Sequence, residues 1–492
     1  MNESVSLLAA ILFPVLSGAF LLLWKKVNDR RKVLIYAGIA MGIAGVLILN
    51  ALLGKEKEIL LFFLTEDIPV VLKLDNMGKW FLAVMSLIWI LAGIFSFSYM
   101  KHEGKERRYF GFYLITLGAM AGLGCAGNLV TMYAFFEFLT LASFPLVIHN
   151  QSREAVMAGL KYLFYSLFGA YMALFGLFFL CRYTDTVSFI PGGTLNMELA
   201  KGNETVLLLA ACLMIVGFSV KAGMFPLHAW LPTAHPVAPA PASALLSGVI
   251  VKAGVLAVIR VIFYEFGADF IRGTWVQYVF MTLSLITVFM GSMLAFRENG
   301  LKKRLAYSTV SQLSYILFGI ALLNPVALTG SLLHVAGHAV IKCALFLCAG
   351  AVIFQTGITT VDGLKGIGKK MPVTIWCFTI VSLGLIGIPP TGGFISKWYL
   401  AMGALESGMK GFQYAGPIVL LVSALLTAGY LLPVTIKGFF PGTDFDYGKT
   451  KKCEAGAAMT IPIVILAALS VLIGMFPNTF IEFIPAFTAG LM

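Results

Sequence analysis

The sequence predicts an all-α polytopic membrane protein with about fourteen transmembrane helices. Of its 492 residues, 59% are hydrophobic and only 12% are charged, whereas soluble domains carry roughly 25% charged residues. Apolar runs of about 20 residues, the length that crosses a bilayer, recur along the whole chain. No remaining stretch is long enough for a soluble domain, so we expect one membrane domain over residues 1–492.

The expected spans are defined by their apolar length and are separated by polar loops. The first span is expected to stay in the protein, because Lys25 and Lys26 follow it, whereas a cleaved signal peptide carries its positive charge before the apolar run. In chain order the spans lie near 5–24, 33–53, 79–99, 110–126, 128–148, 160–181, 205–226, 239–262, 275–296, 305–323, 326–355, 372–402, 414–436 and 457–476.

Basic residues gather in alternate loops. This follows the positive-inside rule and accounts for the net charge of +12 without a nucleic-acid partner. An even number of spans then places both termini outside the cell (inner) membrane. If the N-terminus is outside, most of the 35 Lys and Arg residues lie in inner loops, at 25–32, 101–108, 153–161, 297–304, 365–370 and 437–452.

Charged residues also occur inside the spans, where a charge costs at least about 2.5–3.5 kcal/mol at the bilayer centre. Four of them are lysines, namely Lys221, Lys252, Lys342 and Lys397, and one is an acid, Glu137. Such residues usually face a wet cavity, a partner charge or an ion path. The pattern predicts a buried line of protonatable groups.

The seventh and twelfth spans are expected to be broken helices. Pro226 follows Lys221 by five residues, and a proline removes one helical hydrogen bond and clashes with the preceding turn. Unwound backbone at membrane depth survives only where protein or water surrounds it. In the twelfth span the breaking residues precede Lys397, and they are Pro389, Pro390, Gly392 and Gly393.

These two spans are five apart, so they cross the membrane in opposite directions. A broken helix with a lysine, repeated in the opposite sense, is typical of the inverted repeats of transporters. We expect one five-helix repeat over about 110–262, which is the fourth to eighth spans, and a second over about 275–436, the ninth to thirteenth. The symmetry is imperfect, because Glu137 has no acidic counterpart in the span 305–323.

The eleventh span carries His334, His338 and Lys342 at intervals of one helical turn, hence on one face. Imidazole titrates closest to neutral pH and suits a proton relay. The alternatives are packing residues or a metal site, which would need a third ligand other than lysine. The seven cysteines form no CxxC pair, so neither a disulfide framework nor a zinc or iron–sulfur site is indicated.

Glu137 and Lys221 are candidates for a buried pair. The alternative is a static pair that only joins two helices. Because desolvation roughly cancels the attraction in such pairs, they stabilise weakly, and this favours a role in function.

The chain resembles the antiporter-like subunits shared by respiratory complex I, Mrp-type cation/proton antiporters and membrane-bound hydrogenases. The resemblance covers the third to thirteenth spans. It rests on five motifs: Gly127-Asn128-Leu129 leading to Phe135-Phe136-Glu137, Val220-Lys221 with Pro226-Leu227-His228-Ala229-Trp230-Leu231-Pro232-Thr233-Ala234-His235, Val251-Lys252-Ala253-Gly254, His334-x3-His338-x3-Lys342, and Gly392-Gly393-Phe394-x2-Lys397.

The resemblance implies proton translocation along a mid-membrane chain of buried groups. It implies that Glu137 pairs with Lys221, that Lys252 continues the axis, that His334, His338 and Lys342 bridge the halves, and that Lys397 handles exit or entry. Length and the Phe-Phe-Glu context are most similar to a D-type Mrp subunit, with a subunit of an NADH-quinone oxidoreductase or hydrogenase as the alternative. The implied partners are other membrane subunits, with Na⁺ or K⁺ moved by the complex.

Two other classes remain open. A stand-alone secondary carrier would share broken helices and repeats but should show varied polar groups around a substrate. A purely structural subunit would not need the four buried lysines. Nothing in the sequence indicates a bound flavin, haem or quinone, so no cofactor is expected and any redox chemistry would belong to a partner.

Overall fold

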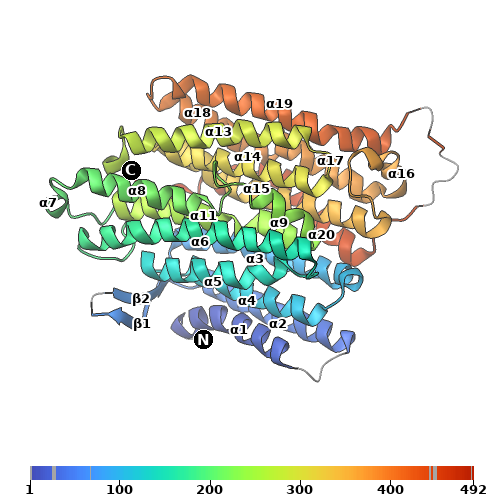
Figure 1. The fold of residues 1–492 in the computed structure, drawn as a ribbon, viewed down its shortest axis with the longest axis horizontal. Helices are drawn as coiled ribbons and strands as arrows, with labels where there is room; N and C mark the ends of the chain where they lie inside the picture. The colour runs from blue at the N-terminus through green and yellow to red at the C-terminus, as the bar shows by residue number, and fades with distance from the viewer. Residues whose placement is uncertain (1–2, 25–28, 67, 443–444, 447–451, 489) are drawn as a thin grey trace.

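The computed structural model is a bundle of long helices that lie roughly along one direction (Figure 1). Both chain ends lie toward the end of the bundle that carries the β-hairpin, and α16 lies toward the opposite end. The structure describes residues 3–24, 29–66, 68–442, 445–446, 452–488 and 490–492.

The N-terminal region contains three long helices and one hairpin: α1 (Glu3–Leu23), α2 (Arg30–Leu53), β1 (Glu58–Thr65), β2 (Ile68–Lys73) and α3 (Asn76–Glu103). The strands are antiparallel, with Leu60 opposite Val71. The sequence predicts helices only, so this hairpin is a correction to the all-α expectation. Its apolar run is too short to cross a bilayer as a helix, and β-branched and aromatic residues favour strands.

A first half of the bundle follows. Its helices are α4 (Glu106–Gly124), α5 (Leu129–Val147), α6 (Arg153–Arg182), α7 (Met197–Ala200), α8 (Glu204–Ser219), α9 (Leu231–Val237), α10 (Ala240–Leu245), α11 (Lys252–Arg260) and α12 (Ala268–Ile271). Two π-helical segments, Leu246–Ile250 and Val261–Phe266, flank α11. Regular helix stops at Ser219 and resumes at Leu231, so Lys221 and Pro226 lie in the interruption.

A second half comes next, and three helices end the chain. The elements are α13 (Trp275–Arg297), α14 (Leu301–Ala321), α15 (Pro325–Thr356), a 3₁₀ turn (Asp362–Leu364), α16 (Ile367–Lys370), α17 (Pro372–Ile386), α18 (Gly392–Glu406), α19 (Phe412–Phe439), α20 (Ala457–Met475), α21 (Asn478–Ile481) and α22 (Pro485–Thr488). Between α17 and α18, Gly387 adopts a positive φ of 94°, which glycine tolerates without steric cost. The prolines 389 and 390 follow it, and Lys397 lies inside α18.

Within the described residues, ten helical segments are long and apolar enough to cross a membrane. In the most apolar 18-residue stretch of each segment, 100% of the residues are buried for 240–266 and 89% for α15. The share is 33% for α2, α19 and α20. The helices that carry Lys252, His334, His338 and Lys342 therefore form the centre of the bundle, and α2, α19 and α20 face outward.

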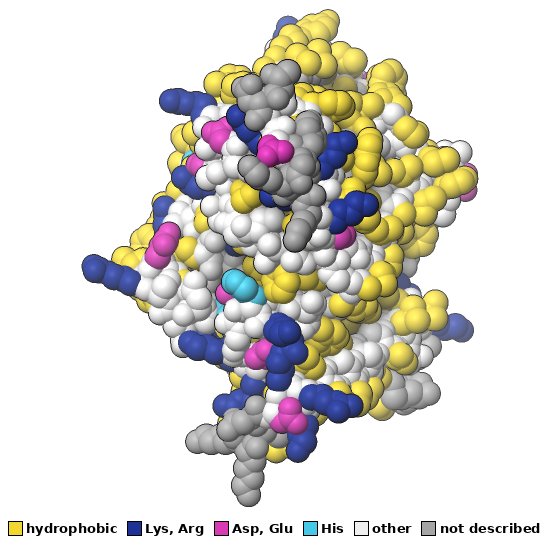
Figure 2. Space-filling view, turned by 90° about the vertical axis from the view of Figure 1, so that its right-hand side faces the viewer, with side chains coloured by type: hydrophobic (Ala, Val, Ile, Leu, Met, Phe, Trp, Pro, Cys, Tyr) yellow, Lys and Arg dark blue, Asp and Glu magenta, His cyan; other side chains and the backbone are white. Residues whose placement is uncertain are grey.

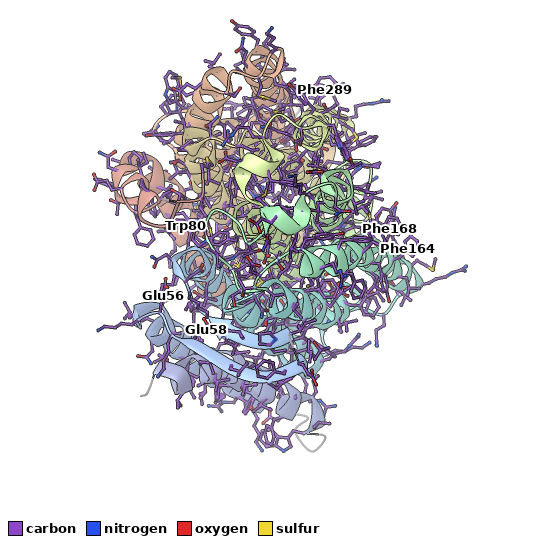
Figure 3. The ribbon with its side chains drawn as sticks, turned by 90° about the vertical axis from the view of Figure 1, so that its left-hand side faces the viewer. Glu56, Glu58, Trp80, Phe164, Phe168 and Phe289 are labelled. Atoms are coloured by element: carbon purple, nitrogen blue, oxygen red, sulfur yellow. The ribbon has the colours of Figure 1, made fainter. Side chains whose placement is uncertain are left out.

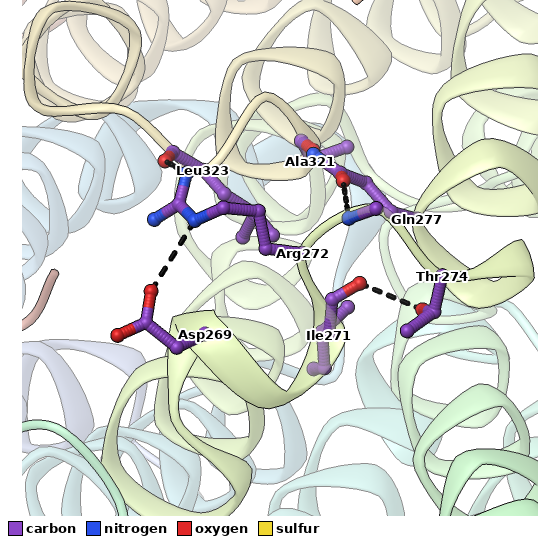
Figure 4. A network of polar contacts seen from close by, with 8 residues as sticks. Asp269, Ile271, Arg272, Thr274, Gln277, Ala321 and Leu323 are labelled. Atoms are coloured by element: carbon purple, nitrogen blue, oxygen red, sulfur yellow. Dashed lines mark hydrogen bonds and ion pairs between the residues drawn. The ribbon is translucent and has the colours of Figure 1, made fainter.

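The connection between the halves is fixed by hydrogen bonds at the corner of α12 and α13 (Figure 4). Arg272 Nη1 donates to the carbonyl of Leu323 at 2.7 Å, and Gln277 Nε2 donates to that of Ala321 at 2.9 Å. These contacts satisfy carbonyls at the end of α14 that have no partner within their own helix. The corner therefore holds the start of the second half against the end of α14.

Lys and Arg side chains gather over the end of the bundle that carries α16, which faces the viewer in Figure 2. The ion pair of Lys303 with Glu298 (2.8 Å) lies in the basic loop between α13 and α14. The predicted inner loops at 297–304 and 365–370 lie at this end. Lys25, Lys26, Lys449 and Lys451, which the sequence assigns to the same end, lie outside the described residues.

Candidate functional site

Lys221 is buried, with 1% of its surface exposed. Its Nζ donates a hydrogen bond to Thr140 Oγ1 of α5. The same ammonium lies 4.6 Å from the ring centroid of Phe136 and 5.7 Å from that of Tyr162. A hydroxyl and two aromatic faces thus replace the water that a lysine loses on burial.

Glu137 lies on α5 between Phe136 and Thr140, the two residues of that helix that contact Lys221. Residues three apart on a helix are neighbours, about 5–6 Å apart at Cβ, so α5 brings the carboxyl into the neighbourhood of Lys221. The described residues include no direct ion pair between the two side chains. The Oε1 atom of Glu137 is buried without a hydrogen-bond partner in that part of the chain.

Lys252 connects the two halves. Its Nζ donates to the carbonyl of Ser247 at 2.6 Å and contacts Nδ1 of His338 at 2.9 Å. An ammonium group has no acceptor atom, so His338 Nδ1 accepts this bond. The carbonyl of Ser247 belongs to the π-helical segment before α11, and π-segments occur frequently at functional sites.

Gly254 allows the first two lysines to approach each other. A Cβ at this position would lie 2.6 Å from the carbonyl oxygen of Phe218 and 3.2 Å from Cβ of Lys221. Any larger residue would therefore push α11 away from the end of α8. The glycine of the Val251-Lys252-Ala253-Gly254 motif keeps the segments of Lys221 and Lys252 packed together.

His334 and His338 form a stacked pair on α15, with ring centroids 5.8 Å apart. His334 Nδ1 lies 2.8 Å from Ser396 Oγ of α18, and its Nε2 lies 3.2 Å from Gln312 Oε1 of α14. Both nitrogens of His334 and one of His338 are thus engaged in hydrogen bonds. Within the described residues, no group of three or more His, Cys, Asp or Glu is placed to hold a metal ion.

Lys342 shares a face of α15 with the histidines, but its contacts lie on another helix. Its Nζ donates to the carbonyl of Leu305 at 3.0 Å and to Ser308 Oγ, both in α14. His338 therefore contacts Lys252, and Lys342 contacts α14. The hydrogen bonds of Lys342 thus lie with α14, whereas Lys252, His338 and His334 contact one another in sequence.

Lys397 reaches across the break between α17 and α18. Its Nζ donates to the carbonyls of Leu385 at 2.6 Å and Ile386 at 2.9 Å, the last two residues of α17. The ammonium also lies 5.1 Å from the ring centroid of Tyr315, which stacks on His334 at 5.7 Å. Ser396, the neighbour of Lys397 in sequence, contacts His334 directly.

The structure contains buried polar groups that sequence reasoning missed. His235 has 0% exposure, stacks on Phe346 at 4.7 Å, and neither ring nitrogen has a hydrogen-bond partner among the described residues. Glu265 is buried, and its Oε2 accepts a bond from Thr194 at 3.0 Å. Titratable residues are rare inside apolar spans, and this observation, which identified the lysines, could also have identified these two residues.

Arg260 was also missed, together with its partner Asp75. The guanidinium donates two bonds of 2.6 Å to Asp75 and lies between the rings of Phe189 and Tyr264, at 4.5 and 4.4 Å. Burial acts to raise the pKa of Asp75, but the charge and hydrogen bonds of Arg260 hold that pKa below its ordinary value. The pair fixes the start of α3 to the end of α11.

A hollow opens beside the interruption in the first half, near the basic loops. Its lining combines one acid, several bases and hydroxyl groups. It is lined by Glu154, Lys161, His228, Ala229, Pro232, Thr233, Pro236, Lys303 and Tyr307.

Comparisons with known proteins agree on one family. The family described as NADH:quinone oxidoreductase/Mrp antiporter, transmembrane, matches residues 126–427. The N subunit of the NADH-quinone oxidoreductase of Desulforudis audaxviator is 31% identical over 423 residues, which cover 84% of this chain and 83% of that protein. The D-type subunit of the Na(+)/H(+) antiporter of Alkalihalophilus pseudofirmus is 28% identical over 486 residues, covering 96% and 94%.

Solved structures share the fold. A chain of the Mrp complex from Dietzia sp. superposes with a TM-score of 0.85 at 23% identity, covering 100% of this chain and 98% of that chain. A chain of respiratory complex I from Thermus thermophilus gives a TM-score of 0.81 at 21% identity, covering 99% and 100%. Together with the motif residues in place around the lysines, these matches show that the chain is a multi-pass, antiporter-like membrane subunit and belongs to the NADH:quinone oxidoreductase/Mrp antiporter family.

Proposed function

We propose that this chain is a D-like, proton-translocating subunit of a multisubunit Mrp-type monovalent cation/proton antiporter. The observation that carries the proposal is the 2.9 Å contact between Lys252 Nζ and His338 Nδ1, because it links a titratable group of the first half to those of the second. The D assignment rests on the share of each chain that the match covers. The D-type antiporter relative is matched over 94% of its length and over 96% of this chain, against 83% and 84% for the N-type oxidoreductase relative.

The proposed path begins at the hollow beside Glu154 and His228 and continues to Glu137 and Lys221. Lys252 passes a proton to His338, whose ring stacks on that of His334, the next group on the path. The bond from His334 to Ser396 then leads to Lys397. Because like charges repel strongly in a low-dielectric interior, a proton arriving at one lysine favours proton loss from the next. The charge of Lys342, held by its contacts with α14, affects how readily the neighbouring groups lose a proton.

The same proposal includes fourteen crossings. To the ten apolar segments it adds α4, α14, the pair α8 and α9, and the pair α17 and α18. The fourth to eighth crossings and the ninth to thirteenth then form the two inverted repeats. Breaks within the seventh and twelfth crossings are what such repeats place at a substrate site.

We further propose that the basic end of the bundle faces the cytoplasm of a cell (inner) membrane and that both termini lie outside. The distribution of Lys and Arg supports this orientation. The partners would be other membrane subunits, since the related structures are parts of larger complexes. Na⁺ or K⁺ would move through the complex in exchange for protons.

A second candidate is a proton-pumping subunit of an NADH-quinone oxidoreductase or a hydrogenase. It is favoured by the 31% identity to the N-type oxidoreductase relative and to hydrogenase-4 component B of Escherichia coli. In either case the redox centres would lie in partner subunits, and this chain would supply the proton path alone.

The proposal is tested by proton flux in everted vesicles that contain the complete host complex. Lys252→Met removes the group that joins the halves, and we expect proton flux to fall by more than about tenfold, since bonds to a charged group contribute about 1.5–3 kcal/mol. The matched control is Lys201→Met, because Lys201 is exposed in the loop between α7 and α8. Wild-type flux in a correctly assembled Lys252→Met complex would refute the path.

The same vesicles separate the two candidate hosts. Added Na⁺ or K⁺ should release the proton gradient in an Mrp-type complex. An electron donor should instead build the gradient if the chain serves an oxidoreductase or hydrogenase.

A further inference from the structure

The helix α6 presents two different faces. Phe164 and Phe168 lie at the rim of the bundle (Figure 3) and are 68% and 48% exposed. Tyr162 and Ser166, one turn apart on the opposite face, are 0% and 2% exposed. This face packs against α5, α8 and α9. It therefore brings a phenol and a hydroxyl into the interior of the first half.

The ring of Tyr162 contacts both Lys221 and Trp230. Its centroid lies 5.7 Å from the ammonium of Lys221 and 4.8 Å from the centroid of the Trp230 ring. The indole is held in turn, because its Nε1 donates to the carbonyl of Val220 at 2.9 Å. Since Val220 precedes Lys221 in the chain, the same segment holds the lysine and the ring that packs on Tyr162. The phenol is thus fixed beside the lysine.

The hydroxyl of Tyr162 bonds to α5. Its Oη lies 2.8 Å from Ser143 Oγ, and either oxygen can be the donor. Ser143 follows Thr140 by three residues, so their hydroxyls are neighbours on one side of α5. Thr140 Oγ1 is the atom that accepts the bond from Lys221 Nζ. Three buried hydroxyls, those of Tyr162, Ser143 and Thr140, therefore lie together on one side of Lys221.

The contacts of Tyr162 also lead toward the hollow in the first half. Lys161, the residue before Tyr162, lines that hollow and donates to Thr233 Oγ1 at 3.2 Å. Ala229 and Thr233 line it as well, whereas Trp230, between them in the chain, is buried against Tyr162. Both aromatic residues are thus adjacent in sequence to residues that line the hollow, and Tyr162 continues to Lys221.

We propose that Tyr162, together with Ser143, relays protons between the hollow and Lys221. The inference rests on the proposed function and adds two residues to its path. A hydroxyl both donates and accepts, so Ser143 donates a proton to Tyr162. Tyr162 passes its own proton to Thr140, a second neighbour of its hydroxyl, and Thr140 passes its proton to the neutral amine of Lys221. Each hydroxyl gains one proton and loses one, and the lysine becomes an ammonium.

The test is proton flux in everted vesicles that contain the complete host complex, divided by the amount of assembled complex. Tyr162→Phe removes the hydroxyl and keeps the ring that contacts Trp230 and Lys221. We expect flux to fall about 10²-fold, the lower end of the range that is typical for loss of a proton-transfer group. The matched control is Tyr171→Phe, because Tyr171 lies on the same helix and is exposed. This control should keep wild-type flux.

Ser143→Ala interrupts the same step from α5 and should lower flux by a similar factor. The double variant should lose no more flux than either single variant, because residues in one hydrogen-bond network are not additive. The melting temperature of the purified complex should stay at its wild-type value in Tyr162→Phe. A residue that only packs would show the opposite pattern, a lower melting temperature with unchanged flux per assembled complex.

Lys221→Ala, measured in the same vesicles, separates this inference from the proposed function. If Lys221→Ala loses its flux while Tyr162→Phe and Ser143→Ala keep theirs, the relay is overturned and the path through Lys221 stands. Additive losses in the double variant, or an equal loss in Tyr171→Phe, would also overturn the relay. Wild-type flux in Lys221→Ala would refute the proposed function itself. If Tyr162→Phe does not assemble, the flux of Ser143→Ala decides.

Discussion

Lys221 in the first half and Lys397 in the second half each lie beside a broken helix, but different groups surround their ammonium ions. Each lies over an aromatic ring, Phe136 at 4.6 Å and Tyr315 at 5.1 Å. Lys221 then bonds to a hydroxyl and has a carboxyl, Glu137, on the same neighbouring helix. Lys397 bonds to two backbone carbonyls at the end of α17.

The difference shows how a buried lysine can be held without an acid. The C-terminal end of a helix carries about half a negative charge on its free carbonyls, so the end of α17 can take the place that Glu137 has in the first half. The helix α14 contains no carboxyl. Its polar residues serve other groups, Ser308 bonding to Lys342 and Gln312 to His334.

Removing the lysine of the first half should have the largest effect. We expect Lys221→Ala to abolish proton flux, with a loss of more than about 100-fold, because a group that transfers protons typically contributes about 10²–10⁴-fold to a rate. The measurement is flux in everted vesicles, with the amount of assembled complex measured in the same membranes. Normal flux with normal assembly would contradict the role of Lys221.

Removing the acid tests whether the halves differ as described. Glu137→Gln keeps the size of the side chain and removes only its charge, and we expect flux to fall nearly as far as in Lys221→Ala. Asn and Gln cannot exchange protons as carboxyls do. If Glu137→Gln retains most of its flux, the first half does not depend on its acid, and the contrast with the second half fails.

The second half should tolerate change better. Lys397→Ala removes both carbonyl bonds and should lose most of the flux, about tenfold or more on the basis of 1.5–3 kcal/mol for a charged hydrogen bond. Lys397→Glu keeps a protonatable group, but only its protonated form can donate to the carbonyls of Leu385 and Ile386, so partial flux is expected. Equal flux in Lys397→Ala and wild type would remove Lys397 from the path.

The sequence could identify the buried lysines and the two broken helices, because charge and proline are rare in apolar spans. It could not determine which way each side chain points. Lys342 lies one helical turn from His338, yet its Nζ contacts the carbonyl of Leu305 in α14. Helical spacing alone does not show whether a side chain turns toward the next group on its own helix or toward a neighbouring helix. Arg260 and Asp75 are 185 residues apart, and only packing brings them together.

The hairpin β1–β2 was missed for a different reason. Its strand Glu58–Thr65 is apolar on both faces, so it lacks the alternation by which a half-buried strand is recognised. The hairpin lies between the expected spans 33–53 and 79–99, and its apolar run is too short to count as a span.

The smallest loss of proton flux is expected for the histidines. They connect the two halves but do not carry the buried lysine charges. Replacing both His334 and His338 with leucine removes the contacts with Lys252, Ser396 and Gln312. Leucine fits the apolar centre, so assembly should fall less than transport. We expect flux to drop about tenfold, less than the 10²-fold lower range that is typical for loss of a proton-transfer group, because the buried lysines on either side of the histidines remain. Flux should be measured together with the amount of assembled complex. Unchanged flux per assembled complex would reduce the histidines to packing residues, and the two halves would then need another link than the one from Lys252 to His338.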